Sequence, residues 1–168
     1  QAESAFQAGN HDYLKLLLQL GHVAEARLAF EPVTGKALHD ARFAAVGLWL
    51  EACEQLPKAR ALATLDGAIA ANRRDFDARF ERAMCLLAGN APVDAMDELL
   101  EILMRDKAWS DGRARKAYVS ILELLTKPTP KPAAAAAGGT LEVAGKSVVA
   151  SADPVIDQYR RKLSMVLF

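Results

Sequence analysis

The segment of this chain closest to a known chemical motif is Thr140–Ser147, with the sequence TLEVAGKS. It differs at one position from a phosphate-binding P-loop, because Thr140 stands where that motif has its first glycine. A P-loop also follows a buried strand and opens a helix, whereas a proline- and alanine-rich stretch precedes this segment. We therefore do not expect the segment to bind a nucleotide.

Other residues that could do chemistry are spaced too widely for a metal site or an activated nucleophile. Cys53 and Cys85 lie in helical patterns without a CxxC motif, and free cysteine is commonly buried as a small apolar residue. Glu98 and Glu101 are expected on an exposed, solvated helix face. The histidines lack a second ligand at zinc-binding spacing and are expected at the surface or at helix ends: His11, His22 and His39. We expect no enzymatic activity, no metal and no cofactor.

The composition favours an alanine- and leucine-rich helical protein. Hydrophobic residues make up 52% of the 168 residues, and aromatic residues only 7%. Lys+Arg and Asp+Glu number 21 each, so no global field attracts nucleic acid or anionic lipid. No apolar run approaches the roughly 18 residues of a membrane span, and no secretory signal is visible. We expect a cytoplasmic protein and, because the first residue is Gln1, a piece of a longer one.

Three alanines set about one repeat apart indicate how the chain is organised. Ala26, Ala61 and Ala95 are separated by 35 and 34 residues. Each has an apolar residue four positions on, namely Phe30, Leu65 and Leu99. A period near 34 residues is typical of the helix–turn–helix unit of tetratricopeptide repeats, in which a small residue is needed where two helices cross. The spacing predicts an all-α solenoid of helical hairpins. Proteins with this fold generally bind other molecules rather than catalyse reactions.

The pattern of apolar residues predicts three hairpins and a further helix over residues 1–126. Residues 1–9 are expected to end an earlier helix at Gly9-Asn10. The return helix of the second hairpin is expected to start at Pro57 and to bury Leu62, Leu65 and Ile69. The further helix is expected to begin with Ser110 or Asp111 as its N-cap. The hairpins are predicted at His11–Leu20 with Val23–Phe30, from near Asp40 to Asn72-Arg73-Arg74-Asp75, and at Phe76–Leu87 with Pro92–Met104.

The composition changes after residue 126. Residues 127–152 are rich in proline, alanine and glycine, which predicts a linker or insert. Within it, Thr140–Ala150 is compatible with a small hairpin or with irregular structure. Asp153-Pro154 is a cap and first-turn signature, which predicts a final helix over residues 153–168.

The final helix is amphipathic, with a basic side at Arg160-Arg161-Lys162. Such a helix can lie on a partner or a membrane, or it can simply cap a solenoid with its charged side in water. Its end, Met165–Phe168, is apolar all round, whereas a solenoid cap normally has a polar outer face. We therefore expect a partner to cover it. The candidate partner-binding residues are Val155, Tyr159, Arg160, Leu163, Val166, Leu167 and Phe168.

Three segments resemble the C-terminal region of the YbbN-type thioredoxin-like co-chaperonins, also called chaperedoxins. They are Ala61–Asp75, Leu103–Leu125 and Asp153–Phe168. The most specific parts are Arg105–Lys116, RDKAWSDGRARK, and Tyr159–Phe168, YRRKLSMVLF. The resemblance covers roughly residues 10–126 and 153–168.

The resemblance implies a client- or chaperonin-binding half of a longer chaperone. Members join an N-terminal thioredoxin fold to helical repeats, hold unfolded or oxidised clients and pass them to a GroEL-type chaperonin. The resemblance places the chaperonin contact on residues 153–168. The present residues contain no thioredoxin domain, so any mixed-disulfide chemistry would belong to the parent. They also carry the insert 127–152 where relatives have a short turn, which leaves open whether the final helix packs on the solenoid. An alternative prediction is a self-associating scaffold, a homodimer formed by exchange of the final helix, with a peptide-binding groove.

Overall fold

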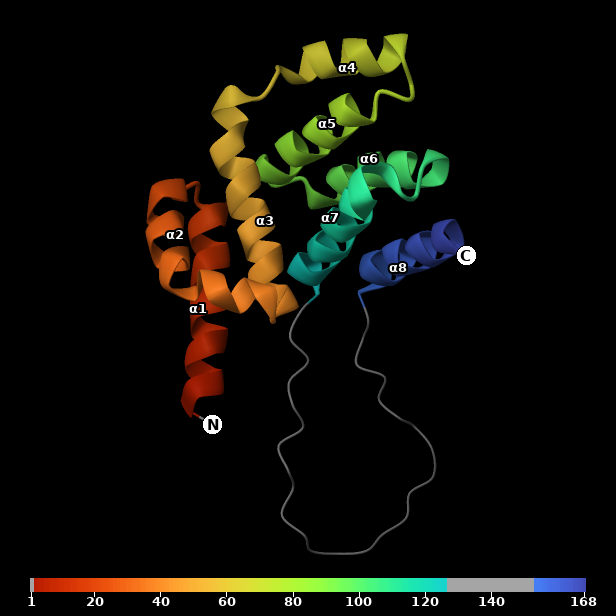
Figure 1. Cartoon of the computed structure of the whole chain (residues 1–168). Coiled ribbons are helices and arrows are strands. Elements are labelled where there is room, and N and C mark those ends of the chain that lie inside the picture. The colour runs from red at the N-terminus through yellow and green to blue at the C-terminus, as the bar shows by residue number, and fades with distance from the viewer. Residues whose placement is uncertain (1, 127–152) are drawn as a thin grey trace, which may run out of the picture.

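The computed structural model describes residues 2–126 and 153–168, and these form eight α-helices and no strand (Figure 1). The all-α fold of helical hairpins is therefore confirmed. The linker 127–152, with its possible hairpin at 140–150 and the segment resembling a P-loop, lies outside the described residues. The helices are α1 (Ala2–Gln19), α2 (Val23–Phe30), α3 (Ala41–Gln55), α4 (Leu62–Ala71), α5 (Phe76–Ala88), α6 (Pro92–Arg105), α7 (Trp109–Leu125) and α8 (Pro154–Leu167), with 3₁₀ segments η1 (Glu31–Leu38) and η2 (Leu56–Lys58).

The first hairpin forms between α1 and α2, as the sequence predicts. The turn uses Gly21 in the left-handed region, at φ +77°. Phe30, at the end of α2, lies so close to Gly47 of α3 that a Cβ there would meet its ring at 3.0 Å. The predicted helix end at Gly9-Asn10 is wrong, because α1 continues through both residues. A lone glycine costs a helix interior only about 1 kcal/mol, which helix on both sides can offset.

The α5–α6 hairpin has the predicted bounds to within one residue, and it has the predicted core. Asp75 caps α5 by accepting a hydrogen bond from the backbone N–H of Ala78 at 3.0 Å. The turn passes through Gly89 and Asn90, with Asn90 at φ +60°. Ala95 is fully buried at the crossing of the two helices. The other predicted inward residues are buried or half-buried around it: Phe80, Ala83, Met84, Leu87, Leu99 and Leu103.

The predicted second hairpin does not close. α3 begins next to Asp40, as expected, and the Asp40 carboxylate caps the helix by accepting from the N–H of Arg42 at 2.9 Å. Pro57, however, lies in η2, and α4 starts only at Leu62. Among the described helices, α3 packs on α1, α5 and α7 and α4 packs on α5, but α3 and α4 do not pack along each other. Figure 1 shows α4 crossing beyond the end of α3.

The connection explains why α4 turns away and why its predicted residues are misplaced. Ala59 and Ala61 have extended ψ angles of 152° and 144°, which redirect the chain after η2. Ala61 is thus an exposed N-cap and not a crossing residue. Of the predicted stripe, Leu65 is fully buried, Ile69 is half-buried and Leu62 is exposed. Ala26 and Ala95 are each the fourth residue of their helix, α2 and α6. The fourth residue of α4 is Leu65 and not an alanine.

The start of α7 also differs from the expectation. Neither Ser110 nor Asp111 is an N-cap, because both have left-handed φ angles, of 50° and 56°, and Gly112 follows at 71°. An N-cap residue typically has extended backbone instead. The right-handed helix resumes at Arg113 and folds back onto α3, a contact beyond the nearest-neighbour packing of a simple stack.

The final helix packs on its own domain. α8 lies beside α6 and α7 (Figure 1). The predicted cap is confirmed, since the Asp153 carboxylate accepts from the N–H of Val155 at 3.0 Å. The open alternative of a free helix is therefore excluded in this structure.

Candidate functional site

A small polar cluster fixes α8 against α6 and α7. The Tyr159 hydroxyl donates to Oδ1 of Asp97 at 2.8 Å, and the Tyr118 hydroxyl donates to the backbone carbonyl of Tyr159 at 2.8 Å. The Lys162 ammonium lies 4.2 Å from the centre of the Tyr159 ring and 3.5 Å from Asp97 Oδ1. Burial, followed by the hydrogen bond to Asp97, raises the pKa of Tyr159 to about 12. Burial likewise raises the pKa of Tyr118. Both hydroxyls therefore remain protonated donors at neutral pH.

Of the seven candidate residues in the final helix, three hold the helix against the core and the other four are at least partly exposed to solvent. Tyr159 is buried, and Leu163 and Val166 pack partly against the core, so these three hold the helix in place. Arg160 is exposed and approaches Asp157, at 3.6 Å, and the Thr126 hydroxyl, at 3.3 Å. The remaining three reach solvent to different degrees: Val155 is exposed, Leu167 is half-buried and Phe168 is fully exposed.

Sequence reasoning missed Ile156, which is buried under α8. It lies three residues before Tyr159 and seven before Leu163, a helical spacing that points to the same face. The neighbouring Val155, which the sequence prediction includes among the candidate residues, is 41% exposed.

A groove of about 600 Å³ runs between α6 and α8. Leu100 and Met104 of α6 and Met165 and Val166 of α8 supply its apolar lining. Met165 is 82% exposed at the lip. The charged lining consists of Arg79, Asp97, Glu98, Glu101 and Lys162. Sequence reasoning missed this groove because it depends on α8 being docked.

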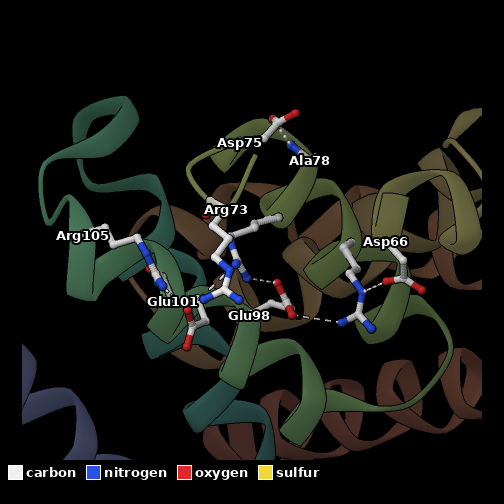
Figure 2. Close-up of polar contacts among 9 residues, drawn as sticks. Asp66, Arg73, Asp75, Ala78, Glu98, Glu101 and Arg105 are labelled. Carbon is white, nitrogen blue, oxygen red and sulfur yellow. Dashed lines mark hydrogen bonds and ion pairs between the residues drawn. The ribbon is translucent and has the colours of Figure 1, made fainter. Parts of the chain in front are cut away.

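An ion-pair network supports the α5–α6 wall of the groove (Figure 2). Arg79 is only 6% exposed, and it donates to Glu98 at 3.0 Å and to the backbone carbonyl of Arg73 at 2.9 Å. Arg82 donates to the other oxygen of Glu98 at 3.1 Å and to Asp66 at 2.7 Å. Two further pairs join Glu101 to Arg79, at 3.9 Å, and to Arg105.

This network corrects the expectation that Glu98 and Glu101 simply face water. The Glu98 side chain is 17% exposed because it bridges two arginines of the neighbouring helix. The sequence did hold a signal, since Arg79 and Arg82 on one helix face Glu98 and Glu101 on the next in the predicted hairpin. Because the groove's charged residues pair with one another, its apolar lining is the part best suited to a ligand.

Several other polar groups also depart from ordinary solvent exposure. His11 is buried, against the expectation of a surface position, and its ring meets that of Phe43 edge-on at 6.0 Å. Burial lowers the pKa of His11. Burial also raises the thiol pKa of Cys53 and Cys85, which lowers the fraction of each that is thiolate. In the part of the chain that the structure describes, no group of His, Cys, Asp and Glu could hold a metal ion.

Comparison with known proteins agrees with the helical hairpins. Residues 55–136 match the family of tetratricopeptide repeats. This part of the chain is therefore similar to a tetratricopeptide-repeat region. The match covers the described helices α4 to α7, and repeats of this type generally mediate protein–protein interaction. No curated protein and no solved structure matches the chain significantly. Among the described helices, none is both long and apolar enough to cross a membrane.

Proposed function

We propose that this tetratricopeptide-repeat domain binds proteins through the α6–α8 groove and the exposed end of α8. In this proposal it is the C-terminal part of a thioredoxin-like chaperone that holds unfolded or oxidised clients and contacts a GroEL-type chaperonin in the cytoplasm. The observation that carries the proposal is an apolar helix end, Met165 to Phe168, beside an open apolar groove. The resemblance of residues 103–125 and 153–168 to the co-chaperonin family supports the choice of partner.

The residues of α8 would have different roles in binding. Phe168, Met165 and Val155 are exposed and would contact the partner directly. Tyr159 is a positioning residue, because its hydroxyl donates to Asp97 of α6 and its backbone carbonyl accepts from Tyr118 of α7. Buried aromatic and aliphatic anchors dominate the energy of most interfaces, so we expect Phe168 to contribute most.

The groove suits clients of varied sequence. Met104 and Met165 stand at its edge, and methionine side chains are flexible and polarisable enough to adapt to different apolar surfaces. Arg79 and Glu98 pair with each other and impose no charge requirement on a client. This lining favours recognition of apolar segments in general over one defined sequence.

A binding titration against a GroEL-type chaperonin tests the proposal. The full chain, a chain ending at Ala152, Phe168→Asp and Leu167→Asp would be compared. Leu38→Asp is the matched control, because Leu38 is as exposed as Met165, at 82%, but lies in η1. We expect the full chain and Leu38→Asp to bind, and at least a tenfold loss for the other three, which corresponds to about 1.4 kcal/mol.

Circular dichroism of each variant separates a lost contact from a lost fold. Phe168→Asp should keep the helical content of the wild type, since the side chain is fully exposed. Equal binding by all variants, or no binding by the full chain, would contradict a chaperonin contact on α8. Unfolding of Phe168→Asp would make that residue part of the core.

A further inference from the structure

We infer that a second copy of this chain occupies the α6–α8 groove when no other partner is bound. The inference deepens the proposed function by giving the same surface a second occupant. It differs from an exchange of α8 between copies, because each α8 stays docked on its own α6 and α7.

The first argument is that one face carries both a protrusion and a hollow. Phe168 is 102% exposed and Met165 is 82% exposed, and both belong to the end of α8. The groove beside them is lined by Leu100 and Met104 of α6 and has a volume of about 600 Å³. It is large enough to take an aromatic side chain together with a methionine.

The second argument is symmetry. A two-fold dimer needs one self-complementary patch, in which a residue of the first copy contacts the hollow of the second and the reverse contact is equivalent. Here α8 contributes both Phe168, the protrusion, and Val166, part of the hollow. Figure 1 shows α8 at the edge of the helical array, with its C-terminus pointing outward. Two copies can therefore approach through this edge.

The third argument is electrostatic. The groove carries both signs of charge, with Asp97 close to Lys162 and Glu98 close to Arg79. The formal net charge of the chain is +0, so two copies do not repel each other at long range. A face of paired charges around an apolar centre is compatible with an identical face turned through a two-fold axis.

The expected dimer is weak and depends on concentration. One buried aromatic side chain contributes about 150–250 Å² of contact, so a patch centred on Phe168 and Met165 lies at the small end of specific interfaces. Sedimentation velocity and light scattering over a wide concentration range would measure it. We expect the average mass to rise from 18.1 kDa toward twice that value with concentration.

Three substitutions identify the surface. Phe168→Asp and Met165→Asp should hold the mass at that of the monomer, whereas Leu38→Asp in η1 should dimerise like the wild type. A monomer at every concentration overturns the inference, as does a dimer that survives both α8 substitutions. An exchanged dimer would survive them, because exchange preserves the contacts of the docked helix and leaves Phe168 exposed.

The result is independent of chaperonin binding. A dimer broken at Phe168 or Met165, together with no chaperonin binding, supports the second copy as occupant while contradicting the chaperonin proposal. Chaperonin binding by a chain that is monomeric at every concentration supports the chaperonin proposal and contradicts the second copy as occupant.

Discussion

The α5–α6 and α3–α4 pairs have similar patterns of apolar residues in the sequence but pack in different arrangements. α5 and α6 form a closed hairpin with a buried alanine, Ala95, at their crossing. α3 and α4 do not pack along each other, and the corresponding alanine, Ala61, is an exposed cap. The periodic apolar residues predict helices in both pairs, but they do not by themselves predict that a pair closes.

The connections account for the difference. The α5–α6 turn is short and uses Asn90 in the left-handed region, a conformation that asparagine tolerates. The α3–α4 connection contains Pro57 and the extended Ala59 and Ala61, which turn α4 toward α5. The ion pairs of Arg79 and Arg82 with Glu98 add a further link between α5 and α6.

The largest effect is expected from removing the carboxylate shared by two arginines. Glu98→Ala leaves Arg79 buried without its nearest carboxylate, and breaking a buried pair in this way costs about 3–5 kcal/mol. Glu54→Ala removes the carboxylate of the more exposed Arg27–Glu54 pair and should cost less than about 1 kcal/mol. Urea unfolding followed by circular dichroism measures both. Equal losses would mean that the network contributes no more than a surface ion pair.

Two equally buried leucines compare the main core with the small cluster under α4. Leu99 belongs to the main core, whereas Leu65 packs in a cluster with Ala78 and Cys85, and both are 0% exposed. Substitution by alanine should cost about 2–5 kcal/mol, near the upper end for Leu99 and the lower end for Leu65. Hydrogen exchange should show that Leu65→Ala loosens α4 alone. Faster exchange throughout the chain in that variant would contradict the independence of α4.

The two alanines test the crossing directly. Ala95→Leu forces extra methylenes into a fully buried contact and should cost about 1–3 kcal/mol. Ala61→Leu places the same side chain on an exposed cap and should change the stability by less than about 0.5 kcal/mol. Thermal unfolding of both variants gives the comparison. A larger loss of stability in Ala61→Leu than in Ala95→Leu would mean that Ala61 lies at a helix crossing after all.

The sequence predicted a structural feature correctly where that feature depends on contacts between residues close together in the chain. The bounds of α5 and α6 to within one residue, the start of α3 near Asp40, the cap at Asp153 and the turn between α1 and α2 all follow from neighbouring residues, and the structure has them where predicted. A cap or turn satisfies backbone groups within a few positions, so its signal lies in the sequence itself.

The misplaced residues depend on contacts between distant segments. Ala26 and Ala95 are buried but Ala61 is not, because the direction of α4 is set by its packing on α5. The α6–α8 groove joins residues some 60 positions apart, as the bond from Tyr159 to Asp97 illustrates. A 34-residue spacing carries no information on such contacts. The half-buried Glu98 was expected to face water for the same reason.

The smallest expected effect concerns how α3 is held without a hairpin partner. α3 packs on α1, where the buried His11 meets Phe43, and burial lowers the pKa of His11 from its usual 6.5. The neighbouring Asp12 opposes this shift, whereas Lys15 and Arg42 add to it. The folded state therefore binds a proton less readily than the unfolded state. Stability should be complete above pH 6.5 and should fall as the pH drops from 6.5 through the folded-state pKa.

His11→Leu should remove this pH dependence while keeping the contact with Phe43. The carboxylates of Asp40 and Glu54 do not interfere, because their pKa values are lowered by Arg42 and Arg27 from 3.8 and 4.5, and their stabilisation is lost only at still lower pH. Urea unfolding at a series of pH values between neutrality and 5 measures how steeply the free energy of unfolding depends on pH. An identical slope in wild type and His11→Leu would show that α3 is not held through an uncharged His11. A shallower slope in the variant would place part of the anchoring of α3 on α1.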